Sequence, residues 1–187
     1  MKSIIKNNKW KQNQFAYHSM TVHVPWRKVA IITEQLRNEN IAIHKAFIYP
    51  EKSVLYVKQA NNDHITVEQK KQIETLVGNI YYEPKCISNI TLPNSTDIWI
   101  YNNQHTILEF SCTDRMGLLT DIINLLVAFP YDIHTGFINT FGPFAHNIFQ
   151  LHYCNKPLSD KDIEYIFNVF EYEVKERHKN IYLNKSY

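Results

Sequence analysis

Hydrophobic residues recur along this chain with the two spacings that distinguish helices from strands. Val29, Ile32 and Leu36 follow the i, i+3, i+7 spacing of an amphipathic helix, and Pro25 stands before them, where the first turn of a helix tolerates proline. Runs of apolar and β-branched residues bounded by turn residues predict strands on either side. The predicted elements are a strand at 20–24, a helix at 29–38, strands at 41–49 and 53–59, and a helix that starts behind Thr66 and runs to about residue 77. Thr66 and Gln69 have the spacing of a capping box.

The same pattern returns 90 residues later. The sequence IAIHKAFI at 41–48 is matched by YDIHTGFI at 131–138, so an Ile-His pair and a Phe-Ile pair keep their spacing. The helical stripe recurs at the same offset, as does a stripe further downstream. The matched positions are Val29, Ile32 and Leu36 with Leu119, Ile122 and Leu126, and Ile73, Leu76 and Ile80 with Ile163, Ile166 and Phe170. Agreement over three elements, each with the right period, indicates a duplicated domain.

The second copy predicts the same order of elements. Its strands fall at 106–112, 132–140 and 146–153, and its helices at 114–129 and from Ser159 onward. Asp114 is the expected N-cap of the first helix, and Ser159 with Asp162 resembles a capping box. The segments 87–90 and 98–101 supply fourth strands or link the two halves.

The order strand, helix, strand, strand, helix is that of the ferredoxin-like plan. We therefore expect an α+β fold of two tandem ferredoxin-like (βαββαβ) domains, with antiparallel sheets and helices on one face. The expected boundaries are an N-terminal arm at 1–19, which carries four lysines and no acidic residue, a first domain at 20–92 and a second at 93–187. A sheet covered on one face needs its other face or its edges covered, so the two sheets should associate, within the chain or in a homo-oligomer.

Composition narrows the class of partner. Hydrophobic residues make up 44% of the 187 residues, enough for a core, and 20 basic against 18 acidic residues leave a formal charge of +2. That charge is far from the concentrated positive field of nucleic-acid-binding proteins, so no nucleic acid is expected as a partner. The longest apolar stretch, at 122–129, is much shorter than a membrane span, and no secretory signal is visible, so we expect a cytoplasmic protein without a membrane partner.

The cysteines and histidines predict neither a disulfide framework nor a metal site. Cys86, Cys112 and Cys154 are odd in number and lack close spacing, which favours reduced thiols. His146, His152 and Cys154 share one strand face by parity, but no fourth ligand has matching spacing. His44 and His134 recur at equivalent positions, which suggests a shared packing role. We expect no metal, no cofactor and no catalytic activity.

One segment narrows the function. Residues 106–122, TILEFSCTDRMGLLTDI, resemble the first strand and helix of an ACT domain, whose signature is Asp-Arg-Pro-Gly-Leu-Leu at the strand-to-helix turn. The segments DIHTGFINT at 132–140 and HNIFQL at 146–151 resemble that family's next two strands. With its lead-in IWIYNNQ at 98–104, the second copy is most similar to the paired C-terminal ACT domains of the bifunctional uridylyltransferases that modify the nitrogen-regulatory PII protein.

The resemblance implies a ligand site at the strand-to-helix turn of the second copy. Met116 stands where the signature has Pro, and Gly117 is retained. A helix N-terminus suits a ligand carboxylate, and Gly117, expected in the first helical turn, leaves room for its approach. Two roles stay open for Asp114: it meets the ammonium group of an amino acid, or it caps its own helix. The candidate ligand-binding residues are Thr113, Asp114, Arg115, Met116, Gly117, Leu118 and Asp132, although Leu118 and Leu119 also suit the core.

In the first copy, Val24, Pro25, Trp26 and Arg27 occupy the positions of Asp114 to Gly117. We expect this turn to be a degenerate structural partner. The resemblance therefore implies a non-catalytic regulatory module that binds a small ligand, in particular an amino acid, at the junction between ACT units and couples its binding to a partner or to the oligomeric state. The alternative is a ligand-independent assembly module, similar to the tandem-ACT repressor of the glycine cleavage system.

Overall fold

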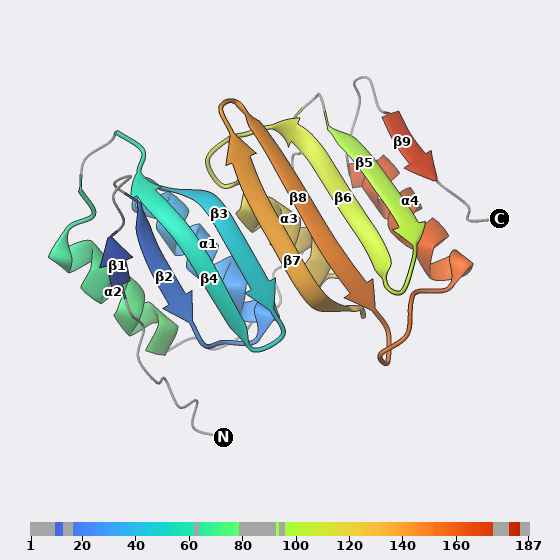
Figure 1. Ribbon diagram of the computed structural model, residues 1–187, viewed down its shortest axis with the longest axis horizontal. Helices are drawn as coiled ribbons and strands as arrows, with labels where there is room; N and C mark the ends of the chain where they lie inside the picture. Colours follow the sequence, from blue (N-terminus) through green and yellow to red (C-terminus); the bar gives the residue numbers. More distant parts are fainter. Residues whose placement is uncertain are drawn as a thin grey trace.

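The structure, a computed structural model, describes residues 10–12, 17–61, 64–78, 93, 96–173 and 180–183. Within these residues the two copies repeat one order of elements, as the sequence predicts (Figure 1). The first copy contains β2 (His18–Val22), α1 (Val29–Asn38), β3 (Ile41–Tyr49), β4 (Lys52–Gln59) and α2 (Val67–Gly78). The second contains β6 (Thr106–Thr113), α3 (Leu118–Val127), β7 (Asp132–Phe141), β8 (Phe144–His152) and α4 (Asp160–Glu173).

Each copy is preceded by a strand that pairs with its first strand. β1 (Trp10–Gln12) lies antiparallel to β2, and β5 (Asp97–Asn102) lies antiparallel to β6. β5 is the strand predicted at 98–101, and β1 lies within the segment predicted as an arm. β9 (Asn180–Leu183) is parallel to β5 and forms the other edge of the sheet. The segment 87–90 lies outside the described residues.

The two copies share one sheet with the strand order β1-β2-β4-β3-β7-β8-β6-β5-β9. They meet where β3 and β7 pair antiparallel, a line that we call the seam. Phe47 stands opposite Phe137, its equivalent in the repeat, so the seam lies on an approximate twofold axis that relates the copies. Gly136 stands opposite Ile48, and a Cβ at Gly136 would lie 3.2 Å from the Ile48 Cβ. The expected association of the two sheets thus occurs within the chain.

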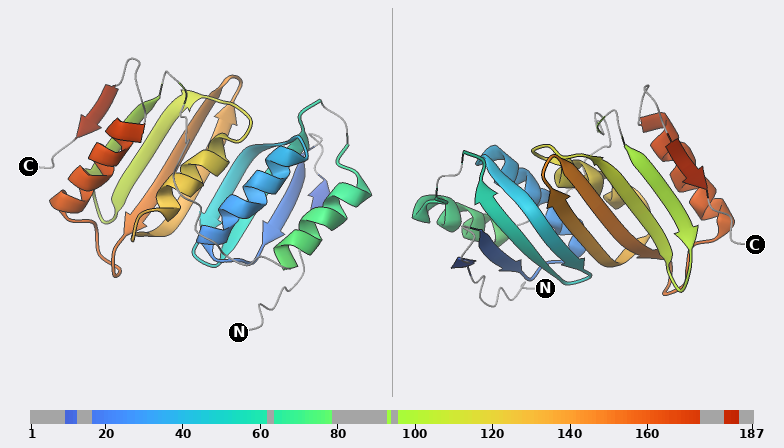
Figure 2. Two further views of the ribbon diagram at one scale, coloured as in Figure 1. Left: turned by 180° about the vertical axis from the view of Figure 1, so that it is seen from behind. Right: turned by 45° about the horizontal axis from the view of Figure 1, so that its top comes forward.

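The four helices cover one face of the sheet, and α1 and α3 lie side by side across the seam (Figure 2). The predicted helical stripes are buried on the sheet side. Their residues are Val29, Ile32 and Leu36 in α1 and Leu119, Ile122 and Leu126 in α3, each at most 5% exposed. Burial of these apolar side chains stabilises the helix layer across the seam. The hydrogen bonds between β3 and β7 stabilise the seam within the sheet.

Two capping boxes are confirmed. The Gln69 N–H donates to Thr66 Oγ1 at 3.1 Å while the Thr66 N–H donates to Gln69 Oε1 at 3.0 Å. Ser159 and Asp162 make the equivalent pair at 3.1 and 3.3 Å. The predicted start of the first helix in the second copy was wrong. α3 begins at Leu118, and its N-cap is Gly117 with φ 81°, so Asp114 does not cap it.

A β-bulge interrupts the inner strand of each copy at the same position. The register between β3 and β4 shifts between Ile43 and Lys45, and that between β7 and β8 shifts between Ile133 and Thr135. The recurring histidines, His44 and His134, are therefore the bulged residues. Each stacks on a neighbouring ring, His44 on Tyr17 and His134 on His105. The predicted packing role is thus a ring stack at a bulge.

Candidate ligand site at the seam

The twofold relation creates two equivalent junctions at the seam. At each, the strand-to-helix turn of one copy meets the helix and inner strand of the other. We call them the Gly117 junction, built on the turn 114–117, and the Arg27 junction, built on the turn 24–27. The turns occupy matching places in the duplication but differ at all four residues.

The Gly117 junction holds a cavity of about 50 Å³. Its lining comes from both copies: the turn and the start of α3 at 114–120, Thr33 and Arg37 of α1, residues 41–43 of β3, and the ends of β7 and β8. Five predicted site residues come together here, namely Asp114, Arg115, Met116, Gly117 and Leu118. The site therefore exists only because the two copies are joined.

Gly117 is required by the backbone and by its neighbour. Its φ of 81° lies in the left-handed region that disfavours side chains with a Cβ. A Cβ at this position would also overlap Cδ of Arg37 from the other copy. The expectation that Gly117 lies in an ordinary first helical turn was wrong, because an αL residue begins α3.

Charged groups of both signs surround this cavity. The Asp121 carboxylate lies 3.8 Å from the Arg37 guanidinium of the other copy and also pairs with Arg115. Burial raises the pKa of the half-buried Asp114 carboxyl, and the nearby Thr140 hydroxyl and Arg115 backbone N–H only partly oppose that rise.

Two buried polar side chains in the cavity lining each have an atom that no described residue pairs with. Asn147 of β8 is 1% exposed and Thr120 of α3 is 2% exposed. Asn147 Nδ2 and Thr120 Oγ1 are both enclosed, and neither has a partner within the described part of the chain. An enclosed polar atom without a partner costs free energy, about 1–3 kcal/mol. Both residues contribute to the lining of the cavity, which places these two atoms beside it.

Two predicted residues lie elsewhere. Thr113 is exposed at the end of β6 and is not part of the cavity lining. Asp132 lies in the Arg27 junction, beside Arg27 and Trp26. Sequence reasoning missed Arg37 and Asn147. Asn147 did leave a signal, because it interrupts a strand face whose other members, Ala145, Phe149 and Leu151, are buried and apolar.

At the Arg27 junction, the chain's own Arg27 side chain occupies the hydrogen-bond acceptors. Nη1 of Arg27 donates to the Val127 carbonyl at 3.0 Å, Nη2 donates to the Tyr131 carbonyl at 2.8 Å, and both reach the Phe129 carbonyl at 3.3 Å. Nη2 also lies 3.4 Å from Asp132 Oδ1. The buried Trp26 ring lies 4.6 Å from the guanidinium carbon. This turn is thus a structural contact between the copies.

The remaining candidate groups make local contacts. His146 Nε2 lies 2.6 Å from Glu109 Oε1, and Cys154 is exposed. Burial raises the pKa of the Cys112 thiol to about 11, which makes it a poor nucleophile. No grouping of residues suited to a metal ion occurs in the described ranges. None of the described helices is long and apolar enough to cross a membrane. Cys86 lies outside the described residues.

Comparison with known proteins supports the fold alone. No protein-family model matches the sequence. The structure is similar to the crystal structure of aspartate kinase from Synechocystis, with a TM-score of 0.52 and 12% sequence identity over 86% of this chain. The chain spans 27% of that protein's length. The similarity and the repeated order of elements together show an α+β fold of two tandem ferredoxin-like, ACT-like domains.

Proposed function

We propose that this chain is a non-catalytic regulatory module that binds a small amino acid at the Gly117 junction. The observation that carries the proposal is the cavity between the two copies, in which Asn147 and Thr120 bury polar atoms without partners. A site that encloses unpaired polar atoms discriminates in favour of ligands that pair with them.

The surrounding groups match the two charges of an amino acid. The first turn of α3 presents backbone N–H groups and the positive end of a helix dipole, and Arg37 and Arg115 add positive charge, so this side suits a carboxylate. The Asp114 carboxylate suits an ammonium group, whose charge would offset the cost of burial. A cavity of about 50 Å³ holds about four water-sized groups, which favours the smallest amino acids.

The position of the site supplies the regulatory coupling. A ligand there would contact α3 of one copy and α1 of the other, so binding would favour one relative placement of the copies. We propose that the response passes to a protein partner or to the oligomeric state. The resemblance of the second copy to the ACT pair of PII uridylyltransferases supports a role in nitrogen metabolism in the cytoplasm.

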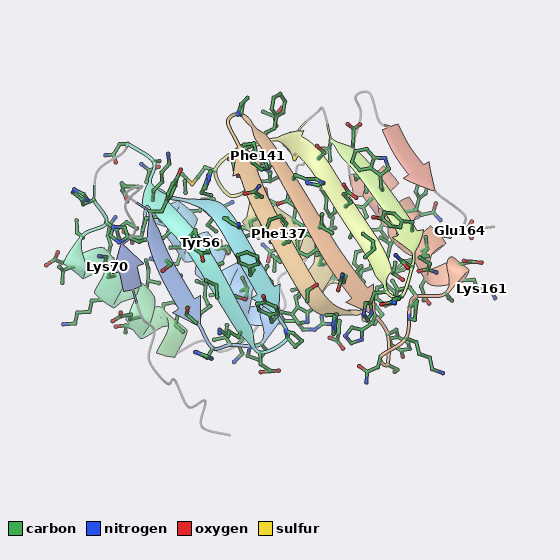
Figure 3. All side chains as sticks on the ribbon, in the orientation of Figure 1. Tyr56, Lys70, Phe137, Phe141, Lys161 and Glu164 are labelled. Atoms are coloured by element: carbon green, nitrogen blue, oxygen red, sulfur yellow. The ribbon has the colours of Figure 1, made fainter. Side chains whose placement is uncertain are left out.

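A second candidate function rests on the uncovered face of the sheet. Tyr56 and Phe137 stand on the face opposite the helices (Figure 3), and the Phe47 ring lies 6.3 and 5.3 Å from theirs. The Lys45 ammonium lies within 5.3 Å of both phenylalanine rings. This half-buried aromatic cluster at the centre of the seam suits a ligand-independent assembly module that docks through its sheet.

Thermal unfolding of the full chain with each of the twenty amino acids separates the two candidates. An amino acid at ~100 times its dissociation constant should add about 2.7 kcal/mol of stability, which raises the melting temperature by about 5–10 °C. The apparent affinity for that amino acid should fall about tenfold in Asp114→Asn. It should stay unchanged in Thr75→Val, a control on the exposed side of α2. If no amino acid stabilises the wild type and the chain self-associates, the assembly module is the better description.

A further inference from the structure

The Arg27 junction has the chemistry of a binding site for a cation. Helix α3 ends at Val127, and its last turn carries the negative end of the helix dipole. The Leu125 and Leu126 carbonyls accept from the Ala128 and Phe129 N–H groups, whereas the Val127 carbonyl accepts from Arg27. The carbonyls of Val127, Phe129 and Tyr131 converge on one point, and the Asp132 carboxylate borders it. A cavity of about 380 Å³ adjoins these groups, with Trp26, Glu51 and His134 in its lining.

The acceptors are arranged for a planar cation with several donors. Two different nitrogens of Arg27 bind three carbonyls at 2.8–3.3 Å, and the Trp26 ring lies 4.6 Å from the guanidinium carbon. A guanidinium presents its N–H groups as a rigid fork and stacks on aromatic rings, whereas an ammonium is a compact point charge. The site therefore suits a guanidinium better than a lysine-like cation.

The Gly117 junction, at the other end of the seam, has different groups at the equivalent positions. Arg27 corresponds to Gly117, and Val127, the first carbonyl acceptor, corresponds to Arg37. The Gly117 junction thus has Arg37 and Arg115 in its cavity lining and no side chain at position 117. The Arg27 junction places negative and carbonyl groups around a positive side chain that its own turn supplies.

We propose that the Arg27 junction is a guanidinium-binding site that the chain fills with its own arginine. This inference is independent of the proposed amino-acid site. In this proposal the Arg27 side chain of the first copy is the ligand of a site in the second copy, and its binding holds the two copies together at this end of the seam. It also implies that a free guanidinium compound binds there once the Arg27 side chain is removed.

The test is rescue of Arg27→Ala by methylguanidinium, followed by thermal unfolding of the full chain. The variant should melt about 5 °C below the wild type, because it loses several charge-assisted hydrogen bonds. Methylguanidinium should raise its melting temperature saturably, with half-saturation in the millimolar range, and methylammonium at equal ionic strength should not. The wild type and Lys28→Ala, which removes the neighbouring cation, should show no saturable response to either salt. Asp132→Asn added to Arg27→Ala should weaken the rescue by about twofold at most, because solvent screens this exposed carboxylate.

Three results would overturn the proposal: wild-type stability of Arg27→Ala, equal responses to both salts, or saturable stabilisation of the wild type by methylguanidinium. If Arg27→Ala does not fold alone, refolding in methylguanidinium should recover its helical circular dichroism signal, and failure to do so also counts against the site. The amino-acid screen on the wild type is a separate measurement, so failure of one proposal leaves the other standing.

Discussion

The Gly117 junction and the Arg27 junction lie at opposite ends of one seam and derive from the same duplicated turn. One has a glycine in the left-handed region, a small cavity and two buried polar atoms without partners. The other has an arginine whose guanidinium binds three carbonyls of the opposite copy. The buried Thr120 of the first corresponds to Ala30 of the second, which carries no polar side-chain group. The residues at equivalent positions thus decide whether the polar groups of a junction are paired by the chain's own side chain or left without a partner.

The largest effect should come from Gly117→Val. We expect it to destabilise the folded chain by about 4 kcal/mol, because a β-branched residue is strained at positive φ and its Cβ would overlap Arg37. Gly142→Val is the matched control, since Gly142 also has positive φ but has open space around it, and should cost about 2 kcal/mol. Denaturant unfolding measures both. Equal losses would show that Arg37 moves aside without cost, and that the close approach at this junction is no constraint.

A smaller effect of opposite sign is expected for Thr120→Val. The substitution keeps the shape of the side chain and removes an enclosed hydroxyl without a partner, so the ligand-free chain should gain about 1 kcal/mol. The control is Thr106→Val, because the Thr106 hydroxyl donates to Asn102 and accepts from the Leu158 N–H. That substitution should cost about 2 kcal/mol. A loss of stability for Thr120→Val in chemical denaturation would indicate that its hydroxyl is already satisfied.

The Asp114→Asn variant should change how stability depends on pH. Burial raises the pKa of the Asp114 carboxyl above its ordinary 3.8, so the folded chain holds this proton more tightly than the unfolded chain does. Its contribution to stability is therefore present below that ordinary value and is lost as pH rises through the raised pKa. We expect the ligand-free variant to gain stability relative to the wild type as pH rises above about 4. Unfolding midpoints at several pH values test this sign, and a gain that appears only on acidification would contradict it.

The smallest effect is expected at Asp132, the acidic residue of the Arg27 junction. Its side chain is 56% exposed and lies 3.4 Å from Arg27, so solvent screens the pair. Asp132→Asn should change stability by less than about 0.5 kcal/mol and leave amino-acid binding at the other junction unchanged. Altered amino-acid affinity, measured by calorimetry, would show that the two junctions are coupled across the seam.

Residue patterns predicted those parts of the fold that depend on local spacing. The helix Val29–Asn38 and the strand Ile41–Tyr49 have the predicted bounds, because buried apolar stripes and turn residues define them. The predicted start of α3 was wrong because a glycine at positive φ ends the preceding turn. Such a backbone angle produces no periodic pattern of hydrophobic residues in the sequence. The sequence pattern also did not predict that β3 pairs with β7, because every uncovered strand edge offers the same hydrogen-bonding groups.

In the candidate site too, the sequence predicted the residues that belong to one local segment and missed those that depend on contacts between the copies. Asp114 to Leu118 were found because their order along the chain forms a recognisable turn. Arg37 was missed because its place in the site depends on which edges of the two copies meet. Arg27 was recognised as a substituted glycine, but its role as an occupant follows only from the position of the α3 carbonyls.

The seam also bears on how the chain folds. Phe47 and Phe137 pair across 90 residues, whereas the hairpins inside each copy close over a few residues. Closing a long loop costs more conformational entropy than closing a hairpin, so each copy can organise its own strands before the seam forms. We therefore expect the β3–β7 ladder to form after these hairpins and to open before them. Its backbone amides should therefore exchange hydrogen through a local opening, while the interior of each copy exchanges only on global unfolding.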